Sequence, residues 1–352
     1  MATLPALHHW CASGDGAQSE YGNLAGFGDR RDPIGQTGRR GKTERPVVPE
    51  TSRRRERRQS NASESFGHGR ISDRSPLPRR FSLPLPESAS GLPPLPAEFW
   101  QTLDDGLGEA DMTLPATTRD AIDGHVRLLL AWNVAINLTA LRTPEQIARN
   151  HVLDSLICVA ALRDLGTAAN LLDIGSGAGF PGLPLAITLP SGRTALVDSI
   201  GKKARFLAVA AAHVVEALAR GGLERPAITA VAERAEDLGQ RPDQREGWEI
   251  VTARAVGTIA EVAELGLPLA SRGGHVVCWK LDSGGGALQA EIAAARRICQ
   301  AAGGGKPRII HLAAADRVGL STHCLVAIEK LRPTPERYPR AAAERRRSPL
   351  LS

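Results

Sequence analysis

The segment from Asn170 to Ile187, NLLDIGSGAGFPGLPLAI, combines an acidic residue, closely spaced glycines and two prolines in an otherwise apolar stretch. Asp173 is followed by glycine at every second position from 175 to 179. Glycine permits positive φ and the close approach of another group to the backbone. Proline is accepted in the first turn of a helix, so Pro181 and Pro184 are compatible with a helix that begins here. The segment predicts a strand, a tight loop and a helix that together hold a ligand.

The residues around this loop separate the ligand classes that use glycine-rich turns. The sequence GAGFPG at 177–182 matches the dinucleotide pattern GxGxxG, which is a weak signal on its own. A P-loop is excluded because no Lys-Ser or Lys-Thr pair follows the glycines. A nucleophile elbow is excluded because Ile174 stands where GxSxG has its first glycine.

The acidic residues favour S-adenosylmethionine over a dinucleotide. Asp173 extends the glycines to D-x-G-x-G-x-G, and a carboxylate there favours a cationic sulfonium ligand. Asp198 follows the next apolar run, where a carboxylate can hold ribose hydroxyls. A third contact is expected after the third run, near the adenine. The residues predicted to bind the cofactor on these grounds are Asp173, Gly175, Gly177, Asp198, Ala235 and Glu236.

Nearly continuous apolar runs alternate with helical patterns after residue 170, as in a mostly parallel sheet covered on both faces. We therefore predict a doubly wound, Rossmann-like α/β fold with seven strands. Together with the preference for S-adenosylmethionine, this fold corresponds to the class I methyltransferase type. No helix separates the last two runs, which indicates an antiparallel end. The expected strands are 171–174, 194–198, 227–232, 249–253, 275–279, 308–313 and 323–331, and the expected helices among them are 202–220, 258–270 and 287–302.

The chain before this region divides into two parts. Residues 1–95 are rich in Arg, Ser and Pro, carry most of the net charge of +6, and have no apolar period, so we predict a disordered basic extension. Residues 96–165 are predicted to form a helical cap, with Ile122, Val126, Leu129 and Leu130 on one face of a helix capped by Thr117 or Thr118. A second helix is expected over 144–162. Residues 166–332 then form the ligand-binding domain, and 333–352 a basic tail.

The cysteine pattern and the hydropathy of the sequence indicate the cellular compartment in which the protein acts. The five cysteines are widely scattered and form no CxxC pair, which argues against a disulfide framework and against a zinc site. No window has the length and hydrophobicity of a membrane span, and the first residues do not resemble a signal peptide. We expect a cytoplasmic monomer without a metal and without membrane contact.

Five segments, in order and at compatible spacing, resemble the glucose-inhibited division protein B family. They are NLTALRTPEQIARNHVLDSL, the loop LLDIGSGAGFPGLPLAI, LVDSIGKKARFL, TARAV and IEKLRPTPERYPR. The resemblance covers roughly 97–350. It departs at Leu281, where the family usually has glycine, and at 341–343, where three alanines replace a Pro-Gly turn. Members of this family are bacterial enzymes that methylate guanine N7 in small-subunit ribosomal RNA.

The resemblance implies the same S-adenosylmethionine-dependent reaction here, with cofactor contacts at Gly175, Phe180, Ala235-Glu236 and Arg254. Guanine N7 carries no proton, so its methylation requires no general base. The sequence is consistent with this acceptor, because no Cys-Pro pair is present and the fourth strand ends in Thr252-Ala253-Arg254 rather than in an Asn/Asp-Pro-Pro-aromatic turn.

Four residues outside the loop are the remaining candidates for the reaction. Arg254 is predicted to contact the cofactor or guanine O6, and Lys280, at the end of the fifth strand, to face the same cleft. His151 and Asp154 lie on one helical face; as no base is needed, we interpret them as joining helix to sheet or lining the cleft.

Two basic groups are candidates for phosphate contacts with small-subunit RNA or the 30S subunit. One follows Asp198 and consists of Lys202, Lys203 and Arg205; the other, at the C-terminal end, consists of Arg332, Arg337, Arg340, Arg345, Arg346 and Arg347. Two alternatives stay open at this point. One is an NAD-dependent dehydrogenase that uses the GxGxxG pattern, and the other is a non-catalytic RNA-binding assembly protein on a relic methyltransferase fold.

Overall fold

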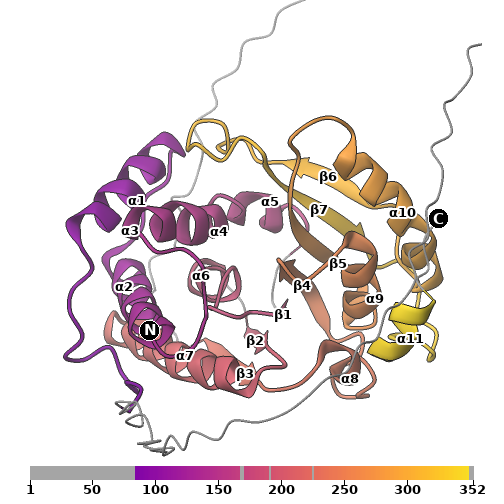
Figure 1. The fold of residues 1–352 in the computed structure, drawn as a ribbon, viewed down its shortest axis with the longest axis horizontal. Helices are drawn as coiled ribbons and strands as arrows, with labels where there is room; N and C mark the ends of the chain where they lie inside the picture. The colour runs from indigo at the N-terminus through magenta and orange to yellow at the C-terminus, as the bar shows by residue number, and fades with distance from the viewer. Residues whose placement is uncertain (1–83, 167–169, 190–191, 224–225, 349–352) are drawn as a thin grey trace, which may run out of the picture. The chain divides into compact units, whose positions relative to one another are not determined.

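The structure is a computed structural model that describes residues 84–166, 170–189, 192–223 and 226–348. Within these residues, seven strands form one sheet in the order β3-β2-β1-β4-β5-β7-β6 (Figure 1). Strand β7 runs antiparallel to both of its neighbours, and the other pairings are parallel. The predicted fold and its antiparallel end are confirmed.

All seven predicted strands are present. The main difference is in β5, which begins five residues earlier than expected (Ala270 rather than 275), because the backbone is already extended there and pairs with Trp248 of β4. The strands are β1 (Asn170–Ile174), β2 (Arg193–Val197), β3 (Ala227–Val231), β4 (Trp248–Arg254), β5 (Ala270–Leu281), β6 (Arg308–His311) and β7 (His323–Glu329).

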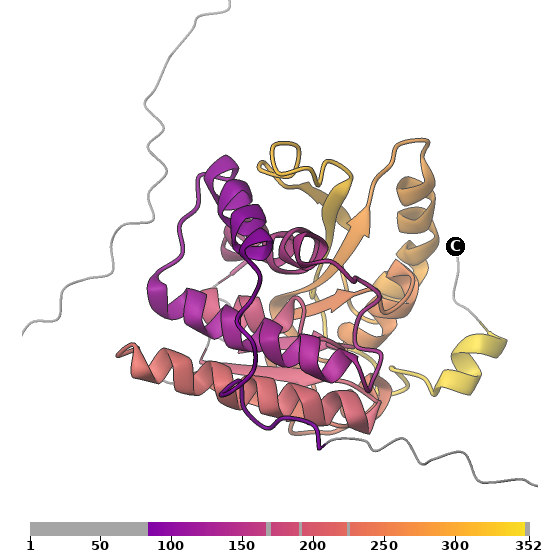
Figure 2. The ribbon, with the colours of Figure 1, turned by 60° about the vertical axis from the view of Figure 1, so that its left-hand side comes forward.

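Helices cover both faces of the sheet because successive strand residues point to opposite sides. Leu171 belongs to a core formed with α2 (Ala116–Asn133), α6 (Gly182–Thr188) and α7 (Gly201–Arg220). Its neighbour Leu172 belongs to a second core, with α9 (Ile259–Gly266) and α10 (Ala287–Ala301). Helices α2 and α7 lie side by side (Figure 2). Further helices are α1 (Ala97–Glu109), α8 (Ala235–Leu238) and α11 (Ala342–Arg347), and the segments between α2 and β1 are described below.

Helix α2 has the predicted apolar face but not the predicted cap. Ile122, Val126 and Leu129 are fully buried, and Leu130 packs partly buried at the edge of the same core. The helix begins directly after Pro115, so Thr117 and Thr118 lie inside its first turn. The capping prediction is therefore wrong, because Pro115 with its restricted φ starts the helix without a side-chain hydrogen bond.

The helix predicted over 144–162 is divided into four pieces. A capping box between Thr143 and Gln146 starts α3 (Pro144–Ile147). A π-helix, η1 (Ala148–Leu153), follows, and then the short helices α4 (Asp154–Leu156) and α5 (Val159–Arg163). π-Helical turns are rare and frequently occur at functional sites.

The folded region extends beyond both predicted borders. Trp132 Nε1 donates to Pro86 O at 2.8 Å, Arg127 Nε donates to Pro93 O at 2.8 Å, and Leu95 is buried. Residues 86–95 are thus attached to α2 through the carbonyls of Pro86 and Pro93, and Leu92 and Leu95 pack with the same core as α2. The rest of the predicted extension, 1–83, lies outside the described residues. At the other end, Tyr338 and Arg340 of the predicted tail are buried.

No helix in the described part of the chain is both long and apolar enough to span a membrane. The four cysteines of that part are buried and unpaired.

Candidate active site

The loop between β1 and α6 has the backbone conformation that its glycines predict. Gly175, Gly177 and Gly179 all have positive φ, between 53° and 85°. A Cβ at Gly175 would also lie 2.7 Å from Val256 Cγ2, so this position excludes a side chain for two reasons. A Cβ at Gly177 would make only ordinary van der Waals contacts, with Gly175 O at 3.7 Å and Asp198 Oδ2 at 4.0 Å, so at this position it is the positive φ that favours glycine.

Asp173 lies beneath the loop and ties it to the sheet. Its carboxylate is fully buried; Oδ1 accepts from Thr252 Oγ1 at 2.7 Å and Oδ2 from Gly182 N at 3.3 Å. Burial raises the pKa of Asp173 to about 6, against the effect of the hydrogen bonds from Thr252 and Ser176.

Asp198 connects the end of β2 to the same loop. Strands β1 and β2 pair in parallel up to Ile174 and Val197, so their carboxyl ends lie at one edge of the sheet. Asp198 Oδ2 accepts from Gly177 N at 3.1 Å, and Oδ1 accepts from Ile200 N at 2.8 Å. Two acidic residues and the glycine loop therefore meet where open α/β sheets bind their ligands.

The third predicted contact lies beyond the next strand. Ala235 and Glu236 form the first turn of α8, just after β3. The Glu236 side chain is mostly buried, and its Oε1 lies 3.4 Å from Arg345 Nη2 and 3.8 Å from Arg234 Nη1.

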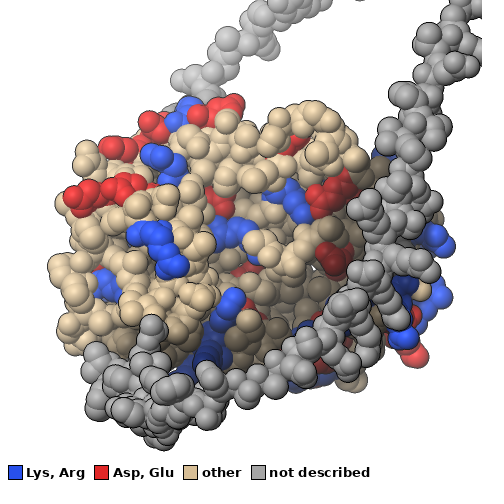
Figure 3. Space-filling view, in the orientation of Figure 1, with Lys and Arg blue, Asp and Glu red and all other residues tan. Residues whose placement is uncertain are grey.

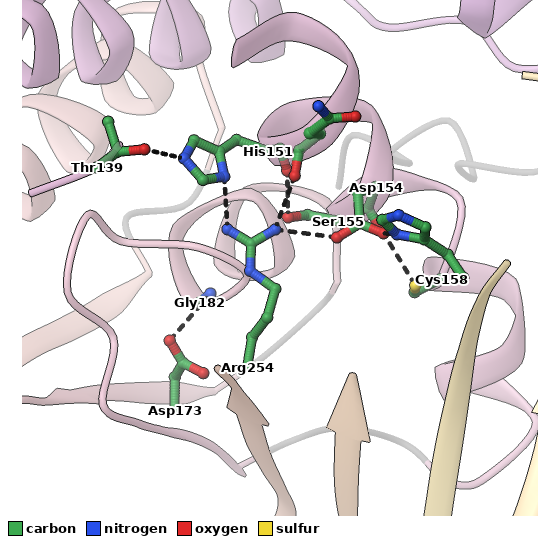
Figure 4. Close-up of polar contacts among 10 residues, drawn as sticks. Thr139, His151, Asp154, Ser155, Cys158, Asp173, Gly182 and Arg254 are labelled. Atoms are coloured by element: carbon green, nitrogen blue, oxygen red, sulfur yellow. Dashed lines mark hydrogen bonds and ion pairs between the residues drawn. The ribbon is translucent and has the colours of Figure 1, made fainter. Parts of the chain in front are cut away.

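Arg254, at the end of β4, is held by three partners from the η1–α4 region (Figure 4). Its Nη1 donates to Asp154 Oδ2 at 2.9 Å and to Asn150 O at 3.1 Å, and its Nη2 donates to His151 Nδ1 at 2.8 Å. Thus His151 and Asp154 do join helix to sheet, as expected. The guanidinium keeps its Nε–H and one Nη2 hydrogen without a partner among the residues that the structure describes.

The contacts of His151 determine its protonation. Arginine only donates, so Nδ1 of His151 accepts and the proton is on Nε2, which donates to Thr139 Oγ1 at 2.8 Å. Burial, together with the charge of Arg254, lowers the pKa of His151 to about 3. Both imidazole nitrogens are therefore engaged, and His151 is neutral at physiological pH.

Two further residues complete this network, and sequence reasoning missed both. His323, the first residue of β7, contacts Asp154 Oδ1 through Nδ1 at 2.7 Å. Thr139 follows α2 in the segment NLTAL. Their side chains are common in loops and at strand ends, so only the position of the last strand beside β5 could have indicated the role of His323.

Phe180 lies inside the site. Its ring is buried, and its centroid lies 5.6 Å from the Arg254 guanidinium carbon. The peptide-bonded neighbours of Phe180 belong to the glycine loop, so this contact brings the loop against the end of β4.

Lys280 does not lie in the network around Arg254. Its Nζ donates to Glu291 Oε1 of α10 at 2.6 Å and to Gly257 O at 3.0 Å. Along β5, Cys278 belongs to the core under α9 and α10, whereas Trp279 belongs to the opposite core. Lys280 shares the side of Cys278, and Arg254 lies on the other side. The expectation that both face one cleft finds no support in these contacts.

The basic side chains near the site do not form one block. Figure 3 shows Lys and Arg as separate groups on this face, with acidic side chains among them. Lys202 is exposed and Lys203 half-buried in the first turn of α7, beyond Asp198. Arg205 is paired with Glu87 at 3.1 Å.

The strand order, the glycine loop after β1 and the acidic residues after β1 and β2 fit S-adenosylmethionine, because a loop of positive φ and two carboxylates lie together at the carboxyl ends of the strands, and carboxylates suit a cationic ligand with hydroxyl groups. The fold and this site define a class I S-adenosylmethionine-dependent methyltransferase.

The comparison with known proteins identifies the family. The GidB model, described as rRNA small subunit methyltransferase G, matches residues 119–318, and the chain belongs to this family. It is 40% identical to ribosomal RNA small subunit methyltransferase G of Roseiflexus castenholzii over 223 residues, 63% of this chain and 88% of that protein. It is 37% identical to the protein of that name from Pelotomaculum thermopropionicum, over 71% of this chain and 98% of that one. Among solved structures, it is similar to an O-methyltransferase from Bacillus cereus in complex with SAH, with a TM-score of 0.38 and 15% identity over 66% of this chain and 99% of that one.

Proposed function

We propose that this protein transfers a methyl group from S-adenosylmethionine to N7 of a guanine in small-subunit ribosomal RNA. Family membership supports the cofactor and the class of RNA. It does not favour a nicotinamide-dependent dehydrogenase or a non-catalytic assembly protein. The bound cofactor supplies an electrophilic methyl group on a sulfonium sulfur. The residues assigned to hold it are Asp173, Gly175, Gly177, Phe180, Asp198, Ala235, Glu236 and Arg254.

The protonation and the hydrogen bonds of the titratable side chains around Arg254 favour guanine N7 as the methyl acceptor. Both nitrogens of His151 are engaged and its pKa is about 3. Both oxygens of Asp154 accept hydrogen bonds, from Arg254 and His323. Neither group is arranged to take a proton from a nucleophile. An acceptor with a lone pair and no proton, such as guanine N7, needs only to be placed in line with the methyl group.

Arg254 is the residue we assign to this placement. Three fixed contacts hold the guanidinium at one orientation, so its remaining N–H groups are preorganised before substrate binds. Guanine O6 lies beside N7 on the edge of the base and is an acceptor that arginine commonly recognises. Lys202 and Lys203 are assigned to nearby phosphates. We propose that the protein acts in the cytoplasm as a monomer. Its substrate is free ribosomal RNA or the assembled small subunit.

The test uses small subunits from a strain that lacks this gene, the purified full-length protein and S-adenosylmethionine with a labelled methyl group. We expect about one methyl group per subunit, located by borohydride and aniline cleavage, which is specific for N7-methylguanine. A label that resists this cleavage would contradict N7 as the acceptor. Binding of NAD but not of S-adenosylmethionine in calorimetric titrations would contradict the whole assignment.

A further inference from the structure

The segment after β7 is fastened to the protein by several charged contacts. Arg340 is buried and forms a bidentate pair with Glu264 of α9, with both N–O distances at 2.7 Å. Arg245 donates to Thr334 O and Tyr338 O, each at 2.8 Å. Residues 334–340 are therefore held against α9 and against the loop after α8.

Helix α11 follows directly from this anchor. Three alanines at 341–343 favour a helix where the family resemblance leads one to expect a Pro-Gly turn. Arg345 Nη1 donates to Arg340 O at 2.6 Å, which fixes its side chain relative to the buried pair. The helix therefore presents Arg345 from a defined place.

The three consecutive arginines of α11 have different surroundings. The Arg345 side chain is only 15% exposed and reaches Glu236 Oε1 at 3.4 Å. Arg346 and Arg347 are exposed, and Arg347 Nε donates to Ala343 O within its own helix. The earlier expectation that all three contact RNA phosphates therefore does not apply equally to Arg345.

Glu236 depends on Arg345 more than on its other cation. Arg234 lies farther away, at 3.8 Å, and its side chain is 63% exposed, so solvent weakens that pair. Both arginines approach Oε1 as ion pairs, and neither oxygen of Glu236 has a hydrogen-bond partner among the described residues. This leaves Oε2 able to accept a hydrogen bond from a ligand.

We propose that Arg345 is a positioning residue for the cofactor site: it orients the Glu236 carboxylate so that Oε2 accepts from a hydroxyl or amino group of the cofactor's nucleoside. This inference rests on the proposed function, which assigns Glu236 to the cofactor. It makes the C-terminal helix a determinant of cofactor affinity, and it separates the role of Arg345 from RNA binding.

The experiment measures the Kd of S-adenosylmethionine by calorimetry with full-length wild type, Arg345→Ala, Arg345→Met and Arg345→Lys. Arg347→Ala is the matched control, because it removes an exposed arginine from the same helix. We expect Kd to rise about fivefold in Arg345→Ala and Arg345→Met, and to stay unchanged in the control. Arg345→Lys should restore part of the affinity, and single turnover at saturating cofactor and RNA should stay at the wild-type rate.

A double-mutant cycle shows whether Arg345 acts through Glu236. In a Glu236→Gln background, Arg345→Ala should raise Kd no further. An undiminished effect there, or equal affinities of Arg345→Ala and Arg347→Ala, would overturn the proposal while leaving the proposed function intact. A wild-type protein that does not bind S-adenosylmethionine would overturn the proposed function first.

Discussion

The imidazole of His151 and the phenyl ring of Phe180 are stacked, with centroids 4.7 Å apart and planes inclined by 13°. His125, from α2, also contacts Phe180, at a centroid distance of 4.6 Å. The ring of Phe180 therefore connects the glycine loop to two separate helical elements that precede the sheet. The order of this loop depends on the helical cap as well as on the loop's own glycines.

Replacing Phe180 by leucine should separate the role of the ring from the role of its volume. Leucine fills most of the same space, so the free energy of unfolding should fall by less than about 1.5 kcal/mol. The stacked contacts with His151 and His125 are lost, and we expect the Kd of S-adenosylmethionine to rise about tenfold. Urea denaturation and calorimetric titration of the same preparation measure both quantities. Unchanged affinity would show that the ring does not order the loop.

Arg254→Ala and Lys280→Ala should differ in turnover. Arg254 points from β4 into the network of His151 and Asp154, so its removal should lower the single-turnover rate at saturating RNA about a hundredfold. Lys280 pairs with Glu291 on the other side of the sheet, so Lys280→Ala should keep nearly the wild-type rate. A large loss of turnover in Lys280→Ala would instead support the catalytic role predicted from the sequence.

Acid should destabilise the protein as two buried histidines resist protonation. Burial lowers the pKa of His125 to about 4, and burial with Arg254 lowers that of His151 to about 3, from 6.5. Between pH 6.5 and 4 the unfolded chain binds these protons and the native chain does not, so the free energy of unfolding falls as the pH falls.

Asp173, with its pKa raised to about 6, has the opposite effect over the same range, but burial also lowers the pKa of His213 and of His275, which adds to the effect of the two buried histidines. Urea denaturation between pH 7.5 and 4.5 measures the net slope. His125→Gln should flatten it, whereas the exposed His311→Gln should not. Stability that rises toward pH 4.5 in the wild type would contradict the neutral state of both histidines.

Truncation should locate the start of the folded region. A chain beginning at residue 84 keeps the contacts of Pro86 and Pro93 with Trp132 and Arg127, and a chain beginning at residue 96 loses them. We expect the Tm of the shorter chain to be several degrees below that of the longer one, because buried Ala89 and Leu95 are also removed. Equal Tm values would place the border at 95, as composition alone suggests.

The strands and the glycine loop could be predicted because their signals are local: apolar runs such as LLDI, and glycines placed where φ is positive. The network around Arg254 could not be predicted in full. One of its acceptors is the carbonyl of Asn150 in a π-helix, and a backbone oxygen has no signature in the residue type. The contact between Arg345 and Glu236 depends on how the C-terminal segment folds back, which periodicity does not reveal. Lys280 does not contact the network around Arg254, because successive residues of a strand point to opposite faces of the sheet and Lys280 lies on the face opposite Arg254.

The pairing of Asp154 with His323 spans 169 positions of the chain, and its pairing with Arg254 spans 100. During synthesis, the helices of the cap leave the ribosome long before the strand that carries His323. Domains generally fold as units as the chain emerges. The two partners of the Asp154 carboxylate are synthesised one after the other, first Arg254 of β4 and then His323 of β7, so both oxygens are satisfied only after β7 has emerged. A chain that ends prematurely before residue 323 leaves this buried acid with an unsatisfied oxygen. In such a fragment the network around Arg254 is incomplete.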